Sequence, residues 1–426
     1  MIVKKLNELS SEDLKVLLSR EIGIQDVLQR VNDIVMDVAE NGDEALRRYT
    51  EQFDGVRLES FRVSDDEIEE AYDAVDESLL RSLELAAQNI YAFHDEERTK
   101  DLWLYQVAPG VVAGQKVVPL ESVGAYVPGG RAAYPSSALM CVIPAKVAGV
   151  ERMVVCTPPD RSGRISPLTL AAADIAGADE IYKLGGAQAI AAMALGTESI
   201  ERVEKIVGPG NIYVTAAKML VRGSVEIDFP AGPSEVLIIA DSSADPEFVA
   251  ADMIAQAEHD PSSIAVVVTT SEPLAKAIET EIPSQIEKAE RRDIVQASLE
   301  RCAILLAESL DDALAFSNAF APEHLELMVR DPMDALNLVR SAGSVFLGHY
   351  TPVAAGDYAT GTNHVLPTAG YARIFSGLNI DAFTKKISIQ SMTADGLESL
   401  ADAIIKMAES EGLRAHAESV RIRMRR

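Results

Sequence analysis

The chain of 426 residues contains six histidines, and four of them stand beside other side chains that can bind a metal ion or transfer a proton. The four clusters are Gln256-Ala-Glu-His259-Asp260, Pro322-Glu323-His324, Gly356-Asp357-Tyr358 followed by His364, and Glu411 with His416. All of them lie beyond residue 250. Imidazole, carboxylate and amide groups gathered in one part of a chain are typical of a metal or acid–base site. The grouping therefore predicts a metalloenzyme.

Gln256 and His259 are three residues apart near the predicted end of a helix, so their side chains share one face. Asp260-Pro261 stops this helix just beyond them. Two neutral ligands alone would bind a divalent ion weakly, whereas Asp357 and His416 would complete a nitrogen and oxygen shell of the kind zinc accepts. The alternative, which is commoner for an isolated pair, is that Gln256 and His259 only cap the helix end.

Glu323 and His324 are adjacent titratable groups, and such a pair can divide base and acid roles if the surroundings separate their pKa values. Neighbours in an extended segment point to opposite faces, so a shared pocket requires a bend, which Pro322 could supply. An exposed loop is the simpler interpretation of this pair. The polar, glycine-containing segment from Asp357 to His364 is typical of a ligand-binding loop, and an ordinary surface loop would have the same composition.

Three glycine-containing turns follow predicted strands, at the strand ends where open α/β sheets bind ligands. They are Tyr126-Val-Pro-Gly-Gly130, Gly185-Gly186-Ala187-Gln188 and Gly208-Pro209-Gly210-Asn211. The last turn opens a predicted helix, where bare backbone amides can bind a pyrophosphate. Tyr213 stands in place of the third glycine of the dinucleotide fingerprint, so a plain tight turn explains this motif about as well.

The elements that must position these residues alternate between short apolar strands and alanine-rich helices. The strand candidates are Val123 to Val127, Met153 to Cys156, Ile181 to Leu184, Ile206 to Val207, Val236 to Ile239, Ile264 to Val268, Ala303 to Leu306 and Ser344 to Leu347. This order predicts two α/β units with mostly parallel sheets. Residues up to about 100 are predicted to be helical and without chemistry, and the stretch from about Asp381 is predicted to be helical and to dock on a second protomer.

Composition limits the partners and the compartment. The net charge of −27 argues against binding to nucleic acid or to an anionic membrane. No apolar stretch approaches the about 18 residues of a membrane span, and the first residues lack the pattern of a signal peptide, so we expect a cytoplasmic protein. Cys141, Cys156 and Cys302 stand in apolar surroundings and are predicted to be buried free thiols.

Taken together, these motifs closely resemble the histidinol dehydrogenases of histidine biosynthesis, over nearly the whole chain. The motifs that carry the resemblance are Ala125 to Gly130, Tyr134-Pro-Ser-Ser137, Gly185 to Gln188, Gly208 to Asn211, Ala231-Gly-Pro-Ser-Glu235, Gln256 to Asp260, Ala321 to His324, Gly356 to Pro367, and Glu411-Gly412-Leu413 with His416. The resemblance implies a four-electron oxidation of L-histidinol to L-histidine through the aldehyde, with one zinc ion per subunit and two NAD molecules reduced in turn.

The resemblance also implies a role for each matching residue. Zinc would be held by Gln256, His259, Asp357 and His416. Glu323 and His324 would be the catalytic pair. The substrate contacts would be Ser234, Gln256, His259, His324, Asp357, His364, Glu411 and His416, with Glu411 and His416 supplied by the partner subunit of a homodimer that shares its active sites. The NAD contacts would be Tyr126, Gln188 and Asn211.

The implied architecture is two incomplete Rossmann-like α/β domains with helical arms at both ends. Its expected boundaries are 1–25 for the N-terminal helical arm, 26–125 with 236–378 for the first α/β domain, which carries the metal and catalytic residues, 126–235 for the second, NAD-binding domain, and 379–426 for a C-terminal helical arm that dimerises.

Two rival functions stay open from the residues alone. A zinc hydrolase would use the same polar set without NAD, and a two-lobed binding protein would have no turnover.

Overall fold

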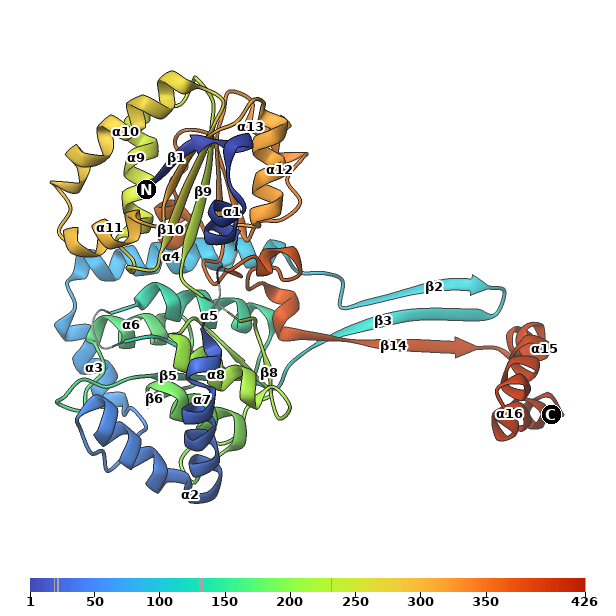
Figure 1. Cartoon of the computed structure of the whole chain (residues 1–426). Coiled ribbons are helices and arrows are strands. Elements are labelled where there is room, and N and C mark those ends of the chain that lie inside the picture. Colours follow the sequence, from blue (N-terminus) through green and yellow to red (C-terminus); the bar gives the residue numbers. More distant parts are fainter. Residues whose placement is uncertain (19, 21–22, 130–132, 231, 426) are drawn as a thin grey trace.

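Two α/β domains and a long projecting arm make up the chain (Figure 1), which the computed structural model describes except for residues 19, 21–22, 130–132, 231 and 426. Gly130 and Ala231 of the sequence motifs lie outside the described residues. Within the described chain, no helix is both long enough and apolar enough to cross a membrane.

The first domain is built on a parallel sheet whose central strands are runs of buried β-branched and leucine side chains, as expected for strands covered on both faces. In spatial order the strands are β1 (Ile2–Lys5), β11 (Ala303–Leu306), β10 (Ile264–Thr269), β9 (Glu235–Ala240), β12 (His324–Met328) and β13 (Ser344–Leu347). One face packs on α9 (Pro246–Ala257), α10 (Glu272–Ile286) and α11 (Arg292–Leu299). The other packs on α1 (Ser11–Leu18), α12 (Leu310–Phe320) and α13 (Pro332–Leu336).

The second domain repeats this plan with a separate parallel sheet. Its strands lie in the order β6 (Glu180–Lys183), β5 (Arg152–Thr157), β4 (Ser122–Tyr126), β7 (Lys205–Val207) and β8 (Glu226–Ile227). One face is covered by α3 (Asp65–Ala74), α4 (Glu77–Glu96), α5 (Pro135–Ala148) and α6 (Pro167–Ile175). The other is covered by α2 (Leu28–Asp54), α7 (Gly186–Leu195) and α8 (Ile212–Val221). The predicted fold class of two mostly parallel α/β units is thus confirmed.

The arm is an antiparallel ribbon that extends away from both domains and ends in a helical pair (Figure 1). It contains β2 (Leu102–Ala108), β3 (Val111–Pro119), β14 (Thr384–Met392), α15 (Ala394–Ser410) and α16 (Arg414–Met424). The sequence predicts only helices in the C-terminal arm, and this prediction is wrong for β14. This strand pairs along its whole length with β3, which lies far away in sequence, so local composition could not reveal it.

Three predicted domain assignments also need correction. Residues 28–96 were assigned to the first domain, but α2, α3 and α4 pack on the second sheet. The N-terminal segment is not purely helical, because β1 adds an edge strand to the first sheet through parallel pairing with β11. The final segment of the predicted first domain likewise leaves it, since Val365 and Leu378 pack in the core of the second domain. Apolar periodicity shows that a helix has a buried face but not which sheet buries it.

Candidate active site

The acid–base pair lies where β9 and β12 begin, side by side in the first sheet. Glu235 is the first residue of β9, and His324, the first of β12, pairs with Val236. Glu323 precedes β12, and the bend that the sequence required is made by Ala321, whose φ of 52° is left-handed. Glu323 Oε2 lies 3.6 Å from His324 Nδ1. Both side chains therefore reach one buried site at the amino ends of these strands.

His324 is held in one orientation by the backbone. Its Nδ1 lies 3.1 Å from the carbonyl oxygen of Glu235, which can only accept, so Nδ1 carries the proton and Nε2 has a free lone pair. Nε2 is buried without a hydrogen-bond partner among the described residues, and it lies 3.7 Å from Asp357 Oδ1. Burial lowers the pKa of His324 to about 3. The imidazole is therefore neutral at neutral pH and can accept a proton at Nε2.

Glu323 is fixed by the same backbone segment. The N–H of Glu235 donates to Glu323 Oε2 at 2.8 Å. Burial raises the pKa of Glu323 well above its usual value, with smaller contributions from the charges of Glu235 and Asp357. Glu235 in turn forms a buried ion pair with Arg20, whose guanidinium stacks 3.8 Å from the centre of the Phe320 ring. A raised pKa makes the Glu323 carboxylate a stronger base than an ordinary glutamate.

Four further predicted site residues lie in this region. Gln256 lies in the last turn of α9 and is buried, and the N–H of His259 donates to its carbonyl oxygen just after the helix. Asp357 lies in the last turn of α14 (Val353–Tyr358), and burial raises its pKa to about 7. Ser234 is half-buried directly before β9. These residues collect at the same end of the first sheet as the acid–base pair.

His364 joins the two domains at the site. Its Nδ1 lies 3.0 Å from the carbonyl oxygen of Asp357, and its Nε2 lies 3.3 Å from Ser137 Oγ on α5 of the second domain. Burial lowers the pKa of His364 to about 4, so this ring is also neutral at neutral pH. The sequence motif around Ser137 thus has a structural role at this contact.

Glu411 and His416 are not brought to this site within one chain. Both are exposed, and they lie at the end of α15 and in α16, on the arm that projects away from the domains (Figure 1). Among the described residues, no group of three or more His, Cys, Asp and Glu side chains is arranged to hold a metal ion. Of the four predicted zinc ligands, Gln256 is not one of these residue types and His416 lies on the distant arm. Only His259 and Asp357 are left near the acid–base pair of the same chain.

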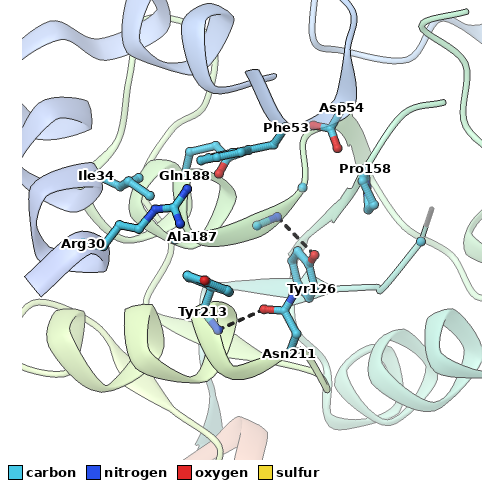
Figure 2. A pocket seen from close by; sticks show the side chains of 13 residues that line it. Arg30, Ile34, Phe53, Asp54, Tyr126, Pro158, Ala187, Gln188, Asn211 and Tyr213 are labelled. Atoms are coloured by element: carbon cyan, nitrogen blue, oxygen red, sulfur yellow. Dashed lines mark hydrogen bonds between the residues drawn. The ribbon is translucent and has the colours of Figure 1, made fainter. Parts of the chain in front are cut away.

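The predicted cofactor contacts line a separate pocket of about 340 Å3 in the second domain (Figure 2). Tyr126 ends β4, and its hydroxyl accepts a hydrogen bond of 3.1 Å from the N–H of Gly186. Gln188 is buried in the first turn of α7, and its Oε1 has no hydrogen-bond partner within the described chain. Asn211 caps α8 by accepting from the N–H groups of Tyr213 and Val214, which leaves its amide group as a donor for a ligand.

Gly208, in the third glycine turn, packs so closely against the backbone of Tyr126 that no side chain fits there. Gly208 has a φ of 111°, and a side chain at this position would meet the Tyr126 carbonyl oxygen at 2.2 Å. The strands β4, β6 and β7 are parallel and belong to one sheet, so the three turns that follow them lie at one edge of the sheet, around one pocket.

One wall of this pocket was missed by the sequence analysis, which found no chemistry in the first 100 residues. Arg30, Ile34, Phe53 and Asp54 of α2 line the pocket opposite Tyr126 (Figure 2). Burial raises the pKa of Asp54 to about 6, and its Oδ2 has no partner among the described residues. The sequence Asp54-Gly55 at the end of α2 looks like any helix end. Only the packing of α2 against α7 shows that Asp54 lines this pocket.

The three cysteines are free and buried, as predicted. Burial raises the pKa of the Cys141 and Cys156 thiols, so neither favours the reactive thiolate. A thiol nucleophile is not part of either site.

These features are those of an enzyme built from two doubly wound α/β domains, with a ligand pocket in one and an acid–base site in the other. The model of the histidinol dehydrogenase family matches residues 18–424. Histidinol dehydrogenase from Methanosarcina mazei is 57% identical, with 99% of this chain and 98% of the relative covered. The enzyme of that name from Methanocaldococcus jannaschii is 52% identical, covering 100% and 99%.

A solved structure agrees with these relatives. The crystal structure of histidinol dehydrogenase from Elizabethkingia anophelis is 41% identical, covers 100% of this chain and 98% of its own, and has a TM-score of 0.96. The chain belongs to the histidinol dehydrogenase family, and it is an oxidoreductase.

Proposed function

We propose that this enzyme oxidises L-histidinol to L-histidine through L-histidinaldehyde, the final step of histidine biosynthesis, with two NAD molecules reduced and one zinc ion per subunit. Family membership supports the substrate. The observation that carries the chemistry is the buried, unpartnered Nε2 of His324, since its Nδ1 is committed to the Glu235 carbonyl oxygen. A cytoplasmic location is part of the proposal, because the substrate and NAD are small intracellular metabolites.

His324 acts as the base in each oxidation. Its neutral Nε2 takes the hydroxyl proton of histidinol in the first step and of the aldehyde hydrate in the second, while a hydride leaves the same carbon each time. Glu323 takes a proton from the water that adds to the aldehyde, which produces that hydrate. The Glu235 N–H and carbonyl groups keep Glu323 and His324 in register, so both proton acceptors lie on one side of the substrate carbon.

The side chains proposed as metal ligands fit a divalent cation. Gln256 is buried and its Nε2 has no partner in the described chain, so the amide is not fixed through its nitrogen and can turn its oxygen towards a cation. Among the described residues, no Lys or Arg is paired with the half-buried Asp357 carboxylate. His259 and Asp357 complete the contribution of one subunit. Zinc, when bound, supplies a template that grips the imidazole and amino nitrogens of histidinol, and NAD, when bound, supplies the hydride acceptor.

The partner subunit supplies His416 and Glu411. Support comes from the arm, which has little core of its own and carries exposed apolar side chains that a second subunit could cover. On β2 these are Leu102, Trp103, Leu104, Tyr105 and Val107. A homodimer with shared active sites would bury this ribbon and bring the end of the arm to the other chain.

Tyr126, Gln188 and Asn211 bind NAD in the pocket of the second domain. The pocket offers the N-terminal amides of α7 and α8, which suit phosphate groups, beside the unpartnered Gln188 Oε1. His364 and Ser234 contact the substrate at the amino end of the first sheet.

The test is the number of NADH molecules formed per L-histidinol consumed, measured with excess NAD on native, chelator-treated and zinc-reloaded protein. Two NADH per histidinol, lost on chelation and restored by zinc, are expected. No NADH from zinc-loaded protein would favour a hydrolase or a binding protein, and one NADH per histidinol would show that the second oxidation is assigned wrongly.

A further inference from the structure

Two carboxyl groups, the half-buried Asp252 and the buried Glu326, interact near the acid–base site, and the proposed function does not use either of them. Asp252 lies on α9 and Glu326 on β12. Glu326 is 1% exposed, and its Oε1 accepts from the N–H of Val353, the first residue of α14, at 3.0 Å. Asp252 is partly buried and interacts with the Glu326 carboxyl group.

Burial favours the protonated form of this pair. Burial raises the pKa of Glu326 well above its ordinary value, and the charge of Asp252 raises it further. Burial also raises the pKa of Asp252 to about 6. Glu326 Oε2 is buried without a hydrogen-bond partner among the described residues, and the neighbouring Asp252 carboxyl group is the group that a shared proton would join to it. Two adjacent carboxylates would repel each other, whereas one shared proton leaves a single charge and one bond.

The three groups that meet here lie one structural repeat away from three site residues. A helical repeat of four residues, or a strand repeat of two, keeps side chains on the same face. The related pairs are Asp252 and Gln256 on α9, Val353 and Asp357 on α14, and Glu326 and His324 on β12. Any rotation of α9 or α14 that broke the contacts of Glu326 would also turn Gln256 or Asp357 away from His324.

We propose that Asp252 and Glu326 form a carboxyl pair that positions Gln256 and Asp357 for metal binding, an inference that rests on the proposed zinc site. The pair touches α9, β12 and α14 at once, so it sets the orientation of two ligand-bearing helices relative to the strand that carries the base. Asp252 and Glu326 are positioning residues and contact neither substrate nor cofactor.

Zinc affinity of the full-length, chelator-stripped protein separates this role from a purely structural one, and two substitutions at Glu326 form a matched pair. Glu326→Gln keeps an acceptor for the Val353 N–H, donates to the Asp252 carboxylate and keeps one negative charge. We expect its zinc dissociation constant to stay within about twofold of wild type. Glu326→Met has a similar volume but makes neither contact, so we expect about 10–100-fold weaker zinc binding, as for other groups that orient metal ligands.

The melting temperature of the zinc-free protein is the control. We expect it to be lower in Glu326→Met than in wild type, because the Val353 N–H and the Asp252 carboxyl group lose their partner, but to stay well above the temperature of the zinc titration. Weaker zinc binding by protein that is folded at the titration temperature supports the positioning role. Zinc binding equal to wild type in Glu326→Met, or equal weakening in both variants, would overturn it.

Asp252→Ala keeps the inference testable if Glu326→Met does not fold, since position 252 is only partly buried and water can enter. The same loss of zinc affinity is expected, and wild-type affinity would contradict the inference. His259→Ala marks complete loss of a ligand. If wild-type protein itself binds no zinc, the proposed metal site fails, and that result is distinct from a failure confined to the variants.

Discussion

The two candidate sites lie at opposite ends of their sheets. The cofactor pocket is at the carboxyl ends of β4, β6 and β7, where Tyr126 and the glycine turns follow the strands. The acid–base site is at the amino ends of β9 and β12, where Glu235 and His324 begin the strands. The usual rule that open α/β sheets bind ligands at their carboxyl ends therefore locates only the first of these sites.

The difference is one of charge. The cofactor pocket receives the N-termini of α7 and α8, whose partial positive charge favours anions such as phosphates. The acid–base site receives the C-terminus of α9, which ends at Gln256 and Ala257 with a partial negative charge that favours a cation. The two domains thus present, at opposite ends of their α/β units, one region that favours anions and one that favours cations. The following substitutions test whether the two sites are independent.

His324→Ala should have the largest effect. Loss of the base is expected to lower kcat by about 10²–10⁴-fold, as for other general bases, while zinc content and NAD binding stay unchanged. Steady-state kinetics with metal analysis and NAD titration would check this. Histidinol oxidation at the wild-type rate would rule out His324 as the base.

His259→Ala should lose zinc and histidinol binding together while leaving the NAD pocket intact. The loss of zinc affinity should exceed the about 10–100-fold cost typical of groups that only orient ligands. Calorimetric titration with zinc and with NAD in parallel gives both values. Weaker NAD binding in this variant would show that the two sites are coupled.

Glu323→Gln should slow hydration and the second oxidation more than the first. The amide keeps an acceptor for the Glu235 N–H but cannot take a proton from water, so the aldehyde stage is where the defect should appear. Rapid-mixing measurements of each NADH can separate the two steps. Equal slowing of both would contradict this division between Glu323 and His324.

Gln188→Ala should affect only the cofactor pocket. The buried Oε1 is expected to contribute one hydrogen bond to the bound dinucleotide, so the dissociation constant of NAD should rise by about tenfold. Zinc affinity should equal that of wild type, which makes this variant the reverse control for His259→Ala. No change in NAD binding would remove Gln188 from the set of contacts.

Asp54→Asn should have the smallest effect, on the stability of the ligand-free protein. Burial raises the pKa of Asp54 to about 6 from 3.8, so the ionised form costs stability that develops as the pH rises from about 4 to about 6. The side chain is partly exposed, so the cost is about 1–2 kcal/mol rather than the full value for two pKa units.

The amide removes this cost and should raise the melting temperature by about 2–4 °C at pH 8. At pH 4 the wild-type carboxyl group is mostly protonated, and the two melting temperatures should nearly coincide. An equal difference at both pH values would exclude the ionisation of Asp54 as the cause.

The sequence by itself determined the local features of this protein. Most strands of both sheets, the helix start after Asn211, the helix end near Gln256 and the buried cysteines follow from apolar periodicity, helix-end signals and glycine, whereas β1, β8 and β12 were not predicted. These are interactions among residues a few positions apart, and the same local signals placed the three glycine turns after their strands.

The tertiary structure decided what comes together. It assigned α2 to the second sheet, where Asp54 lines the cofactor pocket, and it placed Glu326 against Asp252 behind His324. It paired β14 with β3, so His416 lies far from Gln256, His259 and Asp357, the proposed zinc ligands on the same chain. Such contacts join segments tens to hundreds of residues apart, and their free energy depends on which surfaces pack against each other rather than on the pattern within any one segment.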